Sequence, residues 1–441
     1  MNILLISTYE MGRQPLGLAS PAAWLGSAGH HVTCADLSVS QLPEEAARAA
    51  GLIALYLPMH TATRLAVKLI PALREINPGA HLCGYGLYAP LNEGHLRELG
   101  VGTILGGEFE PELVALAAAL EHGDPAPQGP LIALGKLRFQ VPDRSGLPPA
   151  EKYAHLQKDG LSIPAGYTEA SRGCRHLCRH CPVVPVYNGT FRVVQADVVL
   201  EDIRRQVRNG AGHIAFGDPD FFNGPLHARR IVESLHREFP GVTYDVTIKV
   251  EHLRQHRELI PVLKDTGCLF VTSAVESLDN AVLAKLDKGH TRADFIAAVA
   301  DCRRFGLTLA PTFIAFTPWT TLASYREFLA VLNELDLIEN ASPVQLALRL
   351  LIPSGSRMLE LEDVTAVLDG YDAPALLHRW KHPDPEVDRL AEAAIEVAAG
   401  AGSRRQLFRR FWELAQGARL PDEFDLTPRA AIPYMNEPWY C

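Results

Sequence analysis

The stretch that decides the fold reads Cys174-Arg175-His176-Leu177-Cys178-Arg179-His180-Cys181. It holds three of the chain's eight cysteines, separated by three residues and then by two. Three thiolates on one tight loop can hold three irons of a 4Fe–4S cluster and leave the fourth iron without a protein ligand. An open iron can bind a substrate or cosubstrate, whereas a fully ligated cluster mainly carries electrons. The spacing therefore predicts an iron–sulfur centre that takes part in chemistry.

A zinc site is the alternative interpretation of these thiols. Zinc takes four ligands, and His176 or His180 can supply the fourth. Zinc modules usually pair two cysteine clusters, and this sequence has only one. The pattern therefore favours iron–sulfur.

The CxxxCxxC spacing of Cys174, Cys178 and Cys181 resembles the signature of the radical S-adenosylmethionine (SAM) superfamily. There the signature follows the first strand of a partial TIM barrel, and the open iron is chelated by the amino and carboxylate groups of SAM. One electron from the cluster cleaves a sulfonium C–S bond and releases a carbon radical. The resemblance implies a 4Fe–4S cluster and SAM as cofactors, and an external one-electron reductant of the flavodoxin or ferredoxin type.

The composition is that of an ordinary soluble protein, with 47% hydrophobic and 21% charged residues over a length sufficient for two or three domains. A net charge of −9 without a basic run argues against a nucleic-acid partner. No apolar stretch is long enough to span a bilayer, and the first residues predict a strand rather than a signal peptide. Unpaired cysteines and an oxygen-sensitive cluster predict a reducing compartment. We expect a cytoplasmic enzyme that acts on a small molecule and has no membrane partner.

Residues 1–130 alternate predicted strands (2–7, 31–35, 51–57, 81–86 and 101–105) with predicted helices (19–28, 61–76 and 91–99). Such α/β alternation predicts a doubly wound parallel sheet with helices on both faces. Ligands on these sheets bind beyond the carboxyl ends of the strands. The candidate segments are therefore 7–17, 58–63, 86–91 and 106–110.

This half of the chain resembles the cobalamin-binding domain that precedes many radical SAM barrels. The resemblance lies in residues 17–21, in the helix over 22–29, and in Gly106-Gly107-Glu108-Phe109-Glu110 at the start of the last helix. The DxHxxG motif, whose histidine ligates cobalt in many cobalamin proteins, is missing from the loop 8–15. Some radical SAM cobalamin enzymes also lack that histidine. Two alternatives stay open, bound cobalamin or a scaffold with a different role.

Prolines at 125, 127, 130, 142, 148 and 149 mark a linker, which we place at 131–160. Residues 161–355 alternate again, with strands predicted over 167–170, 213–216, 243–250, 269–274, 308–315 and 344–352 and with helices over 196–207, 226–239 and 292–305. Six strands fit a partial (β/α)6 barrel of the TIM type better than a full eight-stranded one. Residues 356–441 are predicted to be mostly helical, with an irregular tail.

Function in such barrels gathers at the carboxyl ends of the strands. Gly217, Asp218 and Asp220 follow the second strand, in the place of the superfamily's GGE-like segment. The resemblance implies that they hold the amino group of SAM, since an ammonium needs carbonyl or carboxylate partners. The alternative is a pair of turn-forming aspartates beside a proline.

Glu276 and Ser277 follow the fourth strand, where the superfamily often places residues near the ribose hydroxyls and carboxylate of SAM. The alternative is an acid at a helix N-terminus, capped by Ser277. Arg349 stands alone in the apolar sixth strand and must be paired, with either the SAM carboxylate or a structural acid. Lys249 and Glu251 on the third strand are further candidates.

The last nine residues, 433–441, are rich in aromatic side chains and end in Cys441, whose thiol can reach a soft ligand. We expect Cys441 to take part in catalysis. The ending EPWYC, together with residues 9–21, resembles radical SAM proteins with a CUAEP or CCAEP tail, although the vicinal cysteine/selenocysteine pair is absent. Related to that group are the enzymes of arsinothricin biosynthesis, which are thought to join a 3-amino-3-carboxypropyl radical from SAM to trivalent arsenic.

Three hypotheses follow. The first is transfer of the 3-amino-3-carboxypropyl group of SAM to arsenite, which leaves methylthioadenosine. The second is a cobalamin-dependent radical SAM C- or P-methyltransferase, which leaves S-adenosylhomocysteine and 5′-deoxyadenosine. The third is a sensing module that binds the cluster without turnover and makes neither product.

Overall fold

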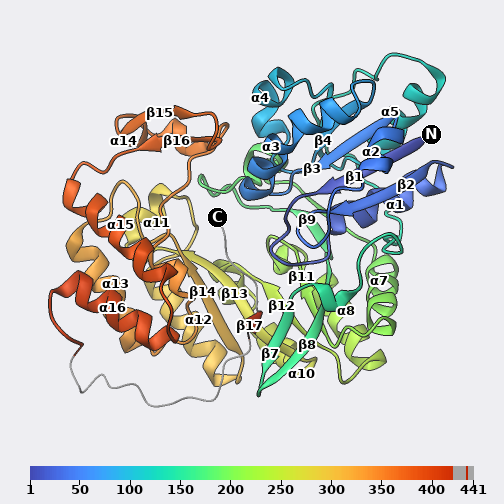
Figure 1. Cartoon of the computed structure of the whole chain (residues 1–441). Helices are drawn as coiled ribbons and strands as arrows, with labels where there is room; N and C mark the ends of the chain where they lie inside the picture. The colour runs from blue at the N-terminus through green and yellow to red at the C-terminus, as the bar shows by residue number, and fades with distance from the viewer. Residues whose placement is uncertain (421–433, 436–441) are drawn as a thin grey trace.

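The computed structural model describes residues 1–420 and 434–435. Two α/β lobes lie one above the other in Figure 1, and helices of the C-terminal region flank the lower lobe. Within the described part of the chain, no helix combines the length and the apolar character needed to cross a bilayer.

The N-terminal lobe is a six-stranded parallel sheet in the order β2-β1-β3-β4-β5-β6. Its strands are β1 (Asn2–Ser7), β2 (His31–Asp36), β3 (Leu52–Tyr56), β4 (His81–Tyr85), β5 (Thr103–Gly107) and β6 (Ile132–Ala133). Successive residues of β1 pack on opposite faces of the sheet. Leu4 and Ile6 share a hydrophobic cluster with residues of α2 (Glu44–Ala49), α3 (His60–Ile76) and α4 (Glu93–Glu98), whereas Ile3 and Leu5 share one with residues of α1 (Leu16–Ser27) and α5 (Glu110–His122). The predicted doubly wound sheet is confirmed.

The second sheet is a curled half-barrel with strand order β14-β13-β12-β11-β8-β7-β17. Five strands are parallel, namely β8 (Leu161–Thr168), β11 (His213–Phe216), β12 (Thr243–Thr247), β13 (Cys268–Glu276) and β14 (Thr308–Phe313). The antiparallel strands β7 (His155–Lys158) and β17 (Tyr434–Met435) extend one side of the sheet. The larger connecting helices are α7 (Ala196–Arg208), α8 (Pro225–Glu238), α9 (Val250–Gln255), α10 (Ile260–Asp265), α11 (Asn280–Lys285), α12 (Arg292–Arg304) and α13 (Leu322–Glu334). The predicted partial barrel is confirmed.

The predicted sixth strand, 344–352, does not form. Pro343 instead opens a 3-10 helix, Pro343–Leu346. What remains is a single β-bridge, in which the Phe316 N–H donates to Leu348 at 2.9 Å and the Leu350 N–H donates to Phe316 at 2.8 Å. Pro353, which has no N–H to donate, follows the bridge.

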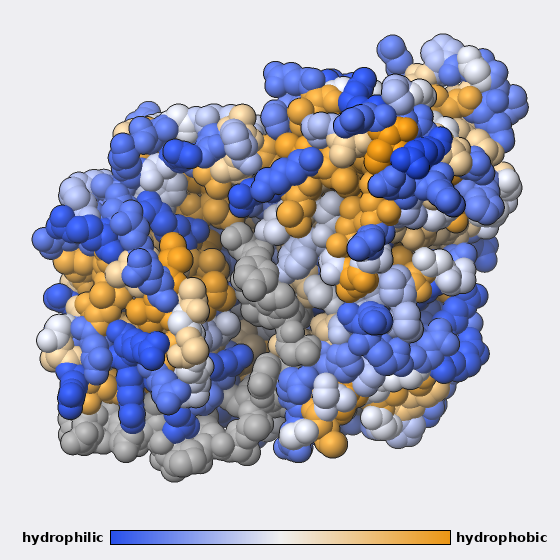
Figure 2. Space-filling view, viewed as in Figure 1, coloured by the Kyte–Doolittle hydropathy of each residue, from blue (hydrophilic) through white to orange (hydrophobic). Residues whose placement is uncertain are grey.

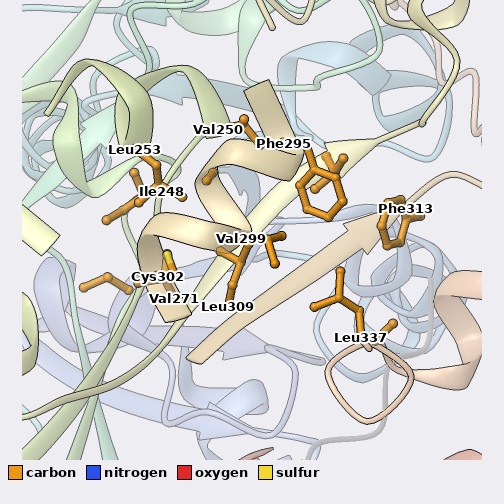
Figure 3. Close-up of a cluster of buried hydrophobic side chains, with 14 of the residues drawn as sticks. Ile248, Val250, Leu253, Val271, Phe295, Val299, Cys302, Leu309, Phe313 and Leu337 are labelled. Carbon is orange, nitrogen blue, oxygen red and sulfur yellow. The ribbon is translucent and has the colours of Figure 1, made fainter. Parts of the chain in front are cut away.

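The core of the half-barrel shows how the outer helices are fixed. In α12, Phe295, Val299 and Cys302 recur at helical spacing and pack on β13 and β14 (Figure 3). A capping box between Thr291 and Asp294 begins this helix. Cys302 is 1% exposed and is a small core residue.

The predicted linker, 131–160, contributes strands to both lobes. Its residues form β6 at the edge of the N-terminal sheet and β7 beside the first strand of the half-barrel. The C-terminal region combines the short helix α14 (Glu362–Thr365), the hairpin β15 (Leu368–Asp372) and β16 (Leu377–Trp380), and the helices α15 (Pro385–Ala399) and α16 (Arg404–Gln416). His60 of α3 contacts the carbonyl of Ala375 at 2.6 Å and so joins the hairpin region to the N-terminal lobe.

Hydrophilic residues are spread over both lobes on the face drawn in Figure 2. The large apolar side chains that are exposed, such as Leu226 at 80% and Leu161 at 63%, lie in different elements of the fold. Scattered exposure of this kind is normal for a protein surface.

Candidate active site

The three cysteines lie on the loop that follows the first barrel strand. Short strand β9 (Ser171–Gly173) leads into the loop and α6 (Val184–Tyr187) ends it, while β9 pairs with β10 (Phe191–Val193). Gly173 has a φ of 74°, and a side chain there would meet the Tyr187 ring. Cys174 and Cys178 are buried and Cys181 is half-buried. The loop therefore presents three thiols at the carboxyl edge of the half-barrel, as predicted.

These thiols lie among buried cations. The Lys249 ammonium is 3.6 Å from the Cys178 sulfur, and Lys288 is 2% exposed. Burial raises the pKa of the Cys174 thiol to about 11 and that of Cys181 to about 12. The thiolate forms therefore need a bound metal, which deprotonates its thiol ligands. Three clustered thiols with ammonium groups beside them fit a 4Fe–4S cluster, whose thiolate ligands carry negative charge.

His176 belongs to a second polar group beside the loop. Its ring lies 3.2 Å from His252, and the His252 Nδ1 is 2.7 Å from an Asp220 carboxylate oxygen. Burial and Lys249 lower the pKa of His176 to about 3, so this imidazole is neutral. Donor atoms of Cys174, His176 and Asp220 lie within 4.8 Å of one another, which is the set that a zinc ion would use. His180 instead contacts Glu276 at 3.1 Å.

The aspartates predicted to hold SAM are engaged with the protein. Asp218 accepts hydrogen bonds from the Ala170 N–H at 2.8 Å and from the Ser171 hydroxyl at 2.6 Å. Asp220 caps the turn η3 (Phe221–Asn223) through the Phe222 N–H. Asp220 thus agrees with the turn-forming alternative, whereas Asp218 holds the segment that leads into the cysteine loop. Gly217 lines a cavity between the lobes.

Glu276 ends β13 with a φ of 70°. It contacts Lys288 at 3.4 Å in addition to His180. Burial opposes its ionisation, but Lys288 and His180 outweigh that effect and lower its pKa to about 2. Glu276 and Ser277 line a cavity of about 370 Å³ at the ends of β13 and β14.

Arg349 does not reach either cavity lining. It donates to Asp388 at 2.7 Å and to the Trp380 carbonyl at 3.2 Å, and its guanidinium lies 4.0 Å from the centre of the Trp380 ring. Of the two partners that we considered, the structure shows the structural acid. Cys441 lies outside the described residues.

The interlobe cavity has a volume of about 200 Å³. Its N-terminal wall comes from the predicted segments 7–17, 58–63, 86–91 and 106–110. Its barrel wall includes Tyr167, Glu169 and Arg172. The cavity thus lies between the carboxyl ends of both sheets and beside the cysteine loop.

A buried ion-pair group joins the two lobes at this cavity, and sequence analysis did not predict it. Arg172, two residues before Cys174, contacts Glu110 at 2.8 Å and Glu108 at 3.3 Å, and it also pairs with Glu169. The side chains of Glu108 and Glu110 are fully buried. Acids in the segment 106–110 were the available signal, but their partner is 62 or more residues away.

A corrinoid would have to extend beyond the described cavity, which is open to its surroundings. A volume of about 200 Å³ is below the range of about 300–1,000 Å³ for pockets of drug-sized ligands, and a corrinoid is larger than those ligands. Glycines in the lining are explained by protein contacts. A side chain at Gly17 would meet the Tyr56 ring at 2.0 Å, and one at Gly107 would meet the Ala133 carbonyl at 2.1 Å. The rings of Tyr56, Tyr85 and Phe109 pack together at the ends of β3, β4 and β5.

Comparison with known proteins finds similarity to SAM-dependent enzymes. Residues 168–329 match the model of the Radical SAM superfamily. The hopanoid C-3 methylase of Methylococcus capsulatus is 27% identical over 168 residues, which are 38% of this chain and 32% of that protein. The bacteriochlorophyllide d C-12(1)-methyltransferase of Chlorobaculum tepidum is 27% identical over 171 residues, which are 38% of this chain and 35% of that protein. The chain spans about a third of the length of these relatives.

Two solved structures share the fold. The radical SAM methyltransferase TsrM of Kitasatospora setae, solved with tryptophan substrate and a SAM analogue, has a TM-score of 0.70 at 14% identity over 95% of this chain and 98% of that chain. The cobalamin-dependent SAM radical enzyme OxsB has a TM-score of 0.67 at 14% identity over 94% of this chain and 71% of that chain.

Proposed function

We propose, because residues 168–329 match the radical SAM model, that this protein is a cobalamin-dependent radical SAM methyltransferase, which cleaves SAM reductively and transfers a methyl group to a small acceptor between its lobes. The two curated relatives described above are a methylase and a methyltransferase, which supports the choice of group.

One observation carries the proposal. The cysteine loop and the interlobe cavity share residues, since Arg172 and Gly173 line the cavity and directly precede Cys174. An acceptor in this cavity would lie beside the position at which SAM is cleaved. Such proximity is what converts a released radical into a productive transfer.

The residues of this chain then have separate roles. Cys174, Cys178 and Cys181 hold the cluster, and Lys249 and Lys288 offset its negative charge. A 4Fe–4S cluster bound here supplies the electron that cleaves SAM.

SAM itself is proposed to extend from the loop along the carboxyl ends of the barrel strands. Gly217 lies on one side of that path, and Glu276 and Ser277 line the cavity on the other side. The Glu276 carboxylate at the end of β13 stays ionised because its pKa is low, so it can accept hydrogen bonds that the ribose hydroxyls donate.

The second candidate is transfer of the 3-amino-3-carboxypropyl group to arsenite. Its support is the resemblance of the ending EPWYC to the tail group described above. The catalytic role of Cys441 is part of this second proposal.

Product analysis tests both candidates. The enzyme is reconstituted anaerobically with iron, sulfide and hydroxocobalamin, reduced with dithionite in the presence of SAM, and its products are analysed by mass spectrometry. We expect S-adenosylhomocysteine together with 5′-deoxyadenosine. Methylthioadenosine in their place would support the second candidate, and a reduced, cluster-loaded enzyme that leaves SAM intact would refute both. The Cys178→Ala variant, which lacks a proposed iron ligand, should form neither set of products. Cys34→Ala, which changes a cysteine outside the loop, is its control.

A further inference from the structure

We propose that the interlobe cavity binds its acceptor as a small cation, an ammonium or a guanidinium, with Glu10 as the principal counter-ion. That the bound cation is the methyl acceptor rests on the proposed function. Binding of a cation in the cavity can be measured without turnover.

Glu10 is a buried acid without a complete set of partners. It is 5% exposed and lines the cavity from the loop after β1. Its Oε2 atom has no hydrogen-bond partner among the described residues. A buried carboxylate that lacks partners is costly, so such a group needs a ligand or a proton.

The charges around Glu10 leave it short of cations. Burial and then Asp36 raise the pKa of Glu10 to about 8, with Glu169 adding to the effect and Arg13 and Arg144 opposing it. A bound cation would supply the charge that this carboxylate lacks, and the burial of the carboxylate strengthens the attraction.

The cation already present at the cavity is committed elsewhere. Arg172 is the single lysine or arginine among the described lining residues, and it faces the three carboxylates of Glu108, Glu110 and Glu169. Glu10 and Glu169 are the acids of the described lining, and the Arg13 guanidinium lies next to it, 5.0 Å from the centre of the Tyr167 ring. With two acids and one base, the lining itself favours a cationic ligand over an anionic one.

The remaining walls suit the same class of ligand. Tyr56, Tyr167 and Phe109 line the cavity, and two of these rings already carry a guanidinium group, Tyr167 that of Arg13 at 5.0 Å and Phe109 that of Arg172 at 5.5 Å. Met11 and Met59 add apolar surface. The volume of about 200 Å³ limits the ligand to a compact molecule.

A matched series of fluorinated probes tests the inference by ¹⁹F NMR on the cluster-loaded enzyme. The probes are 4-fluorobenzylamine, 4-fluorobenzyl alcohol and 4-fluorobenzoate, which share a ring and differ in charge. We expect the amine to bind about tenfold or more tightly than the alcohol, because hydrogen bonds to charged groups are the stronger ones. The benzoate should bind no better than the alcohol.

Glu10→Gln removes the charge and keeps the shape, and it should reduce amine binding to the level of the alcohol. Glu233→Gln on α8, which breaks an exposed pair with Arg229, is the control and should leave the series unchanged. Equal binding of all three probes, or amine binding that survives Glu10→Gln in an enzyme with a normal cluster spectrum, would overturn the inference. Failure of the proposed function would appear separately, as amine binding by an enzyme that forms no SAM-derived product.

Discussion

Lys249 gives the most direct link between the structure and the redox chemistry. The Lys249 ammonium lies 3.6 Å from the Cys178 sulfur, and Lys249 as a whole is 6% exposed. Reduction adds a negative charge to the cluster, and a neighbouring cation favours that step. Lys249→Met keeps much of the side-chain volume and removes the charge, so we expect it to lower the reduction potential.

The size of the effect follows from Coulomb's law. The added electron is spread over a cluster that extends beyond the sulfur, so we take a distance of about 7 Å and an effective dielectric constant of about 20, which gives about 2 kcal/mol. For a one-electron couple this energy is about 100 mV. Glu251, which lies 3.4 Å from the same ammonium, should act in the opposite direction, so Glu251→Gln should raise the potential.

The assay is an anaerobic redox titration of the reconstituted cluster, followed by electron paramagnetic resonance. Lys264→Met is the matched control, because this exposed lysine lies on α10 near the amino end of β13, away from the cysteine loop. A Lys249→Met midpoint that equals the wild-type value, or that shifts upward, would refute the electrostatic argument. Slower SAM cleavage with an unchanged midpoint would show that Lys249 acts on SAM instead.

The remaining predictions concern the loop, the cavity and the buried charges. Cys178→Ala removes an iron ligand, so the variant should lose SAM cleavage, measured as 5′-deoxyadenosine release; a normal cluster spectrum with turnover would contradict the assignment. Incubation with hydroxocobalamin followed by gel filtration should leave stoichiometric corrinoid absorption on the protein, whereas its absence would show that the N-terminal lobe is a scaffold with a different role. Arg172→Met strands three carboxylates and should lower the free energy of unfolding by about 3–5 kcal/mol in denaturant titrations; a loss below about 1 kcal/mol would mean that the acids pick up protons at little cost. Burial raises the pKa of Glu108 to about 7, so the folded state holds this proton more tightly than the unfolded state does, and the resulting stability is lost as the pH rises from about 4.5 to 7. The free energy of unfolding of Glu108→Gln should therefore depend less on pH in that range. An unchanged pH dependence would count against the buried acid.

Local sequence was enough to predict both sheets and the cysteine loop. Buried strands such as β1 carry continuous apolar runs, and the spacing of Cys174, Cys178 and Cys181 needs no distant partner to be recognised. The sixth barrel strand was predicted wrongly because its apolar residues fit a strand, while Pro343 turns the backbone into a 3-10 helix. Sequence alone could not decide between a ligand and a structural acid for Arg349, since Asp388 is 39 residues away.

The interlobe site was predicted only by half. The order of strands and helices predicted that the carboxyl edge of the N-terminal sheet forms one wall of a site. It did not predict the barrel wall that faces this edge. Arg172 and Glu108 come from different lobes and meet only after both have folded and docked. Long-range pairs of this kind leave no periodic pattern in the sequence, and the acid-rich character of the cavity therefore became visible only in the structure.

The pairing of β17 with β7 has a consequence for handling the protein. Tyr434 and Met435 occupy the outer side of β7, so residues from the far end of the chain cover a strand that would otherwise offer free N–H and carbonyl groups. Uncovered edge strands pair with the same strand of a neighbouring molecule and begin aggregation. A chain shortened before residue 434 would thus expose the edge of β7 to neighbouring molecules, and preparations of it should be judged by light scattering before their activity is compared.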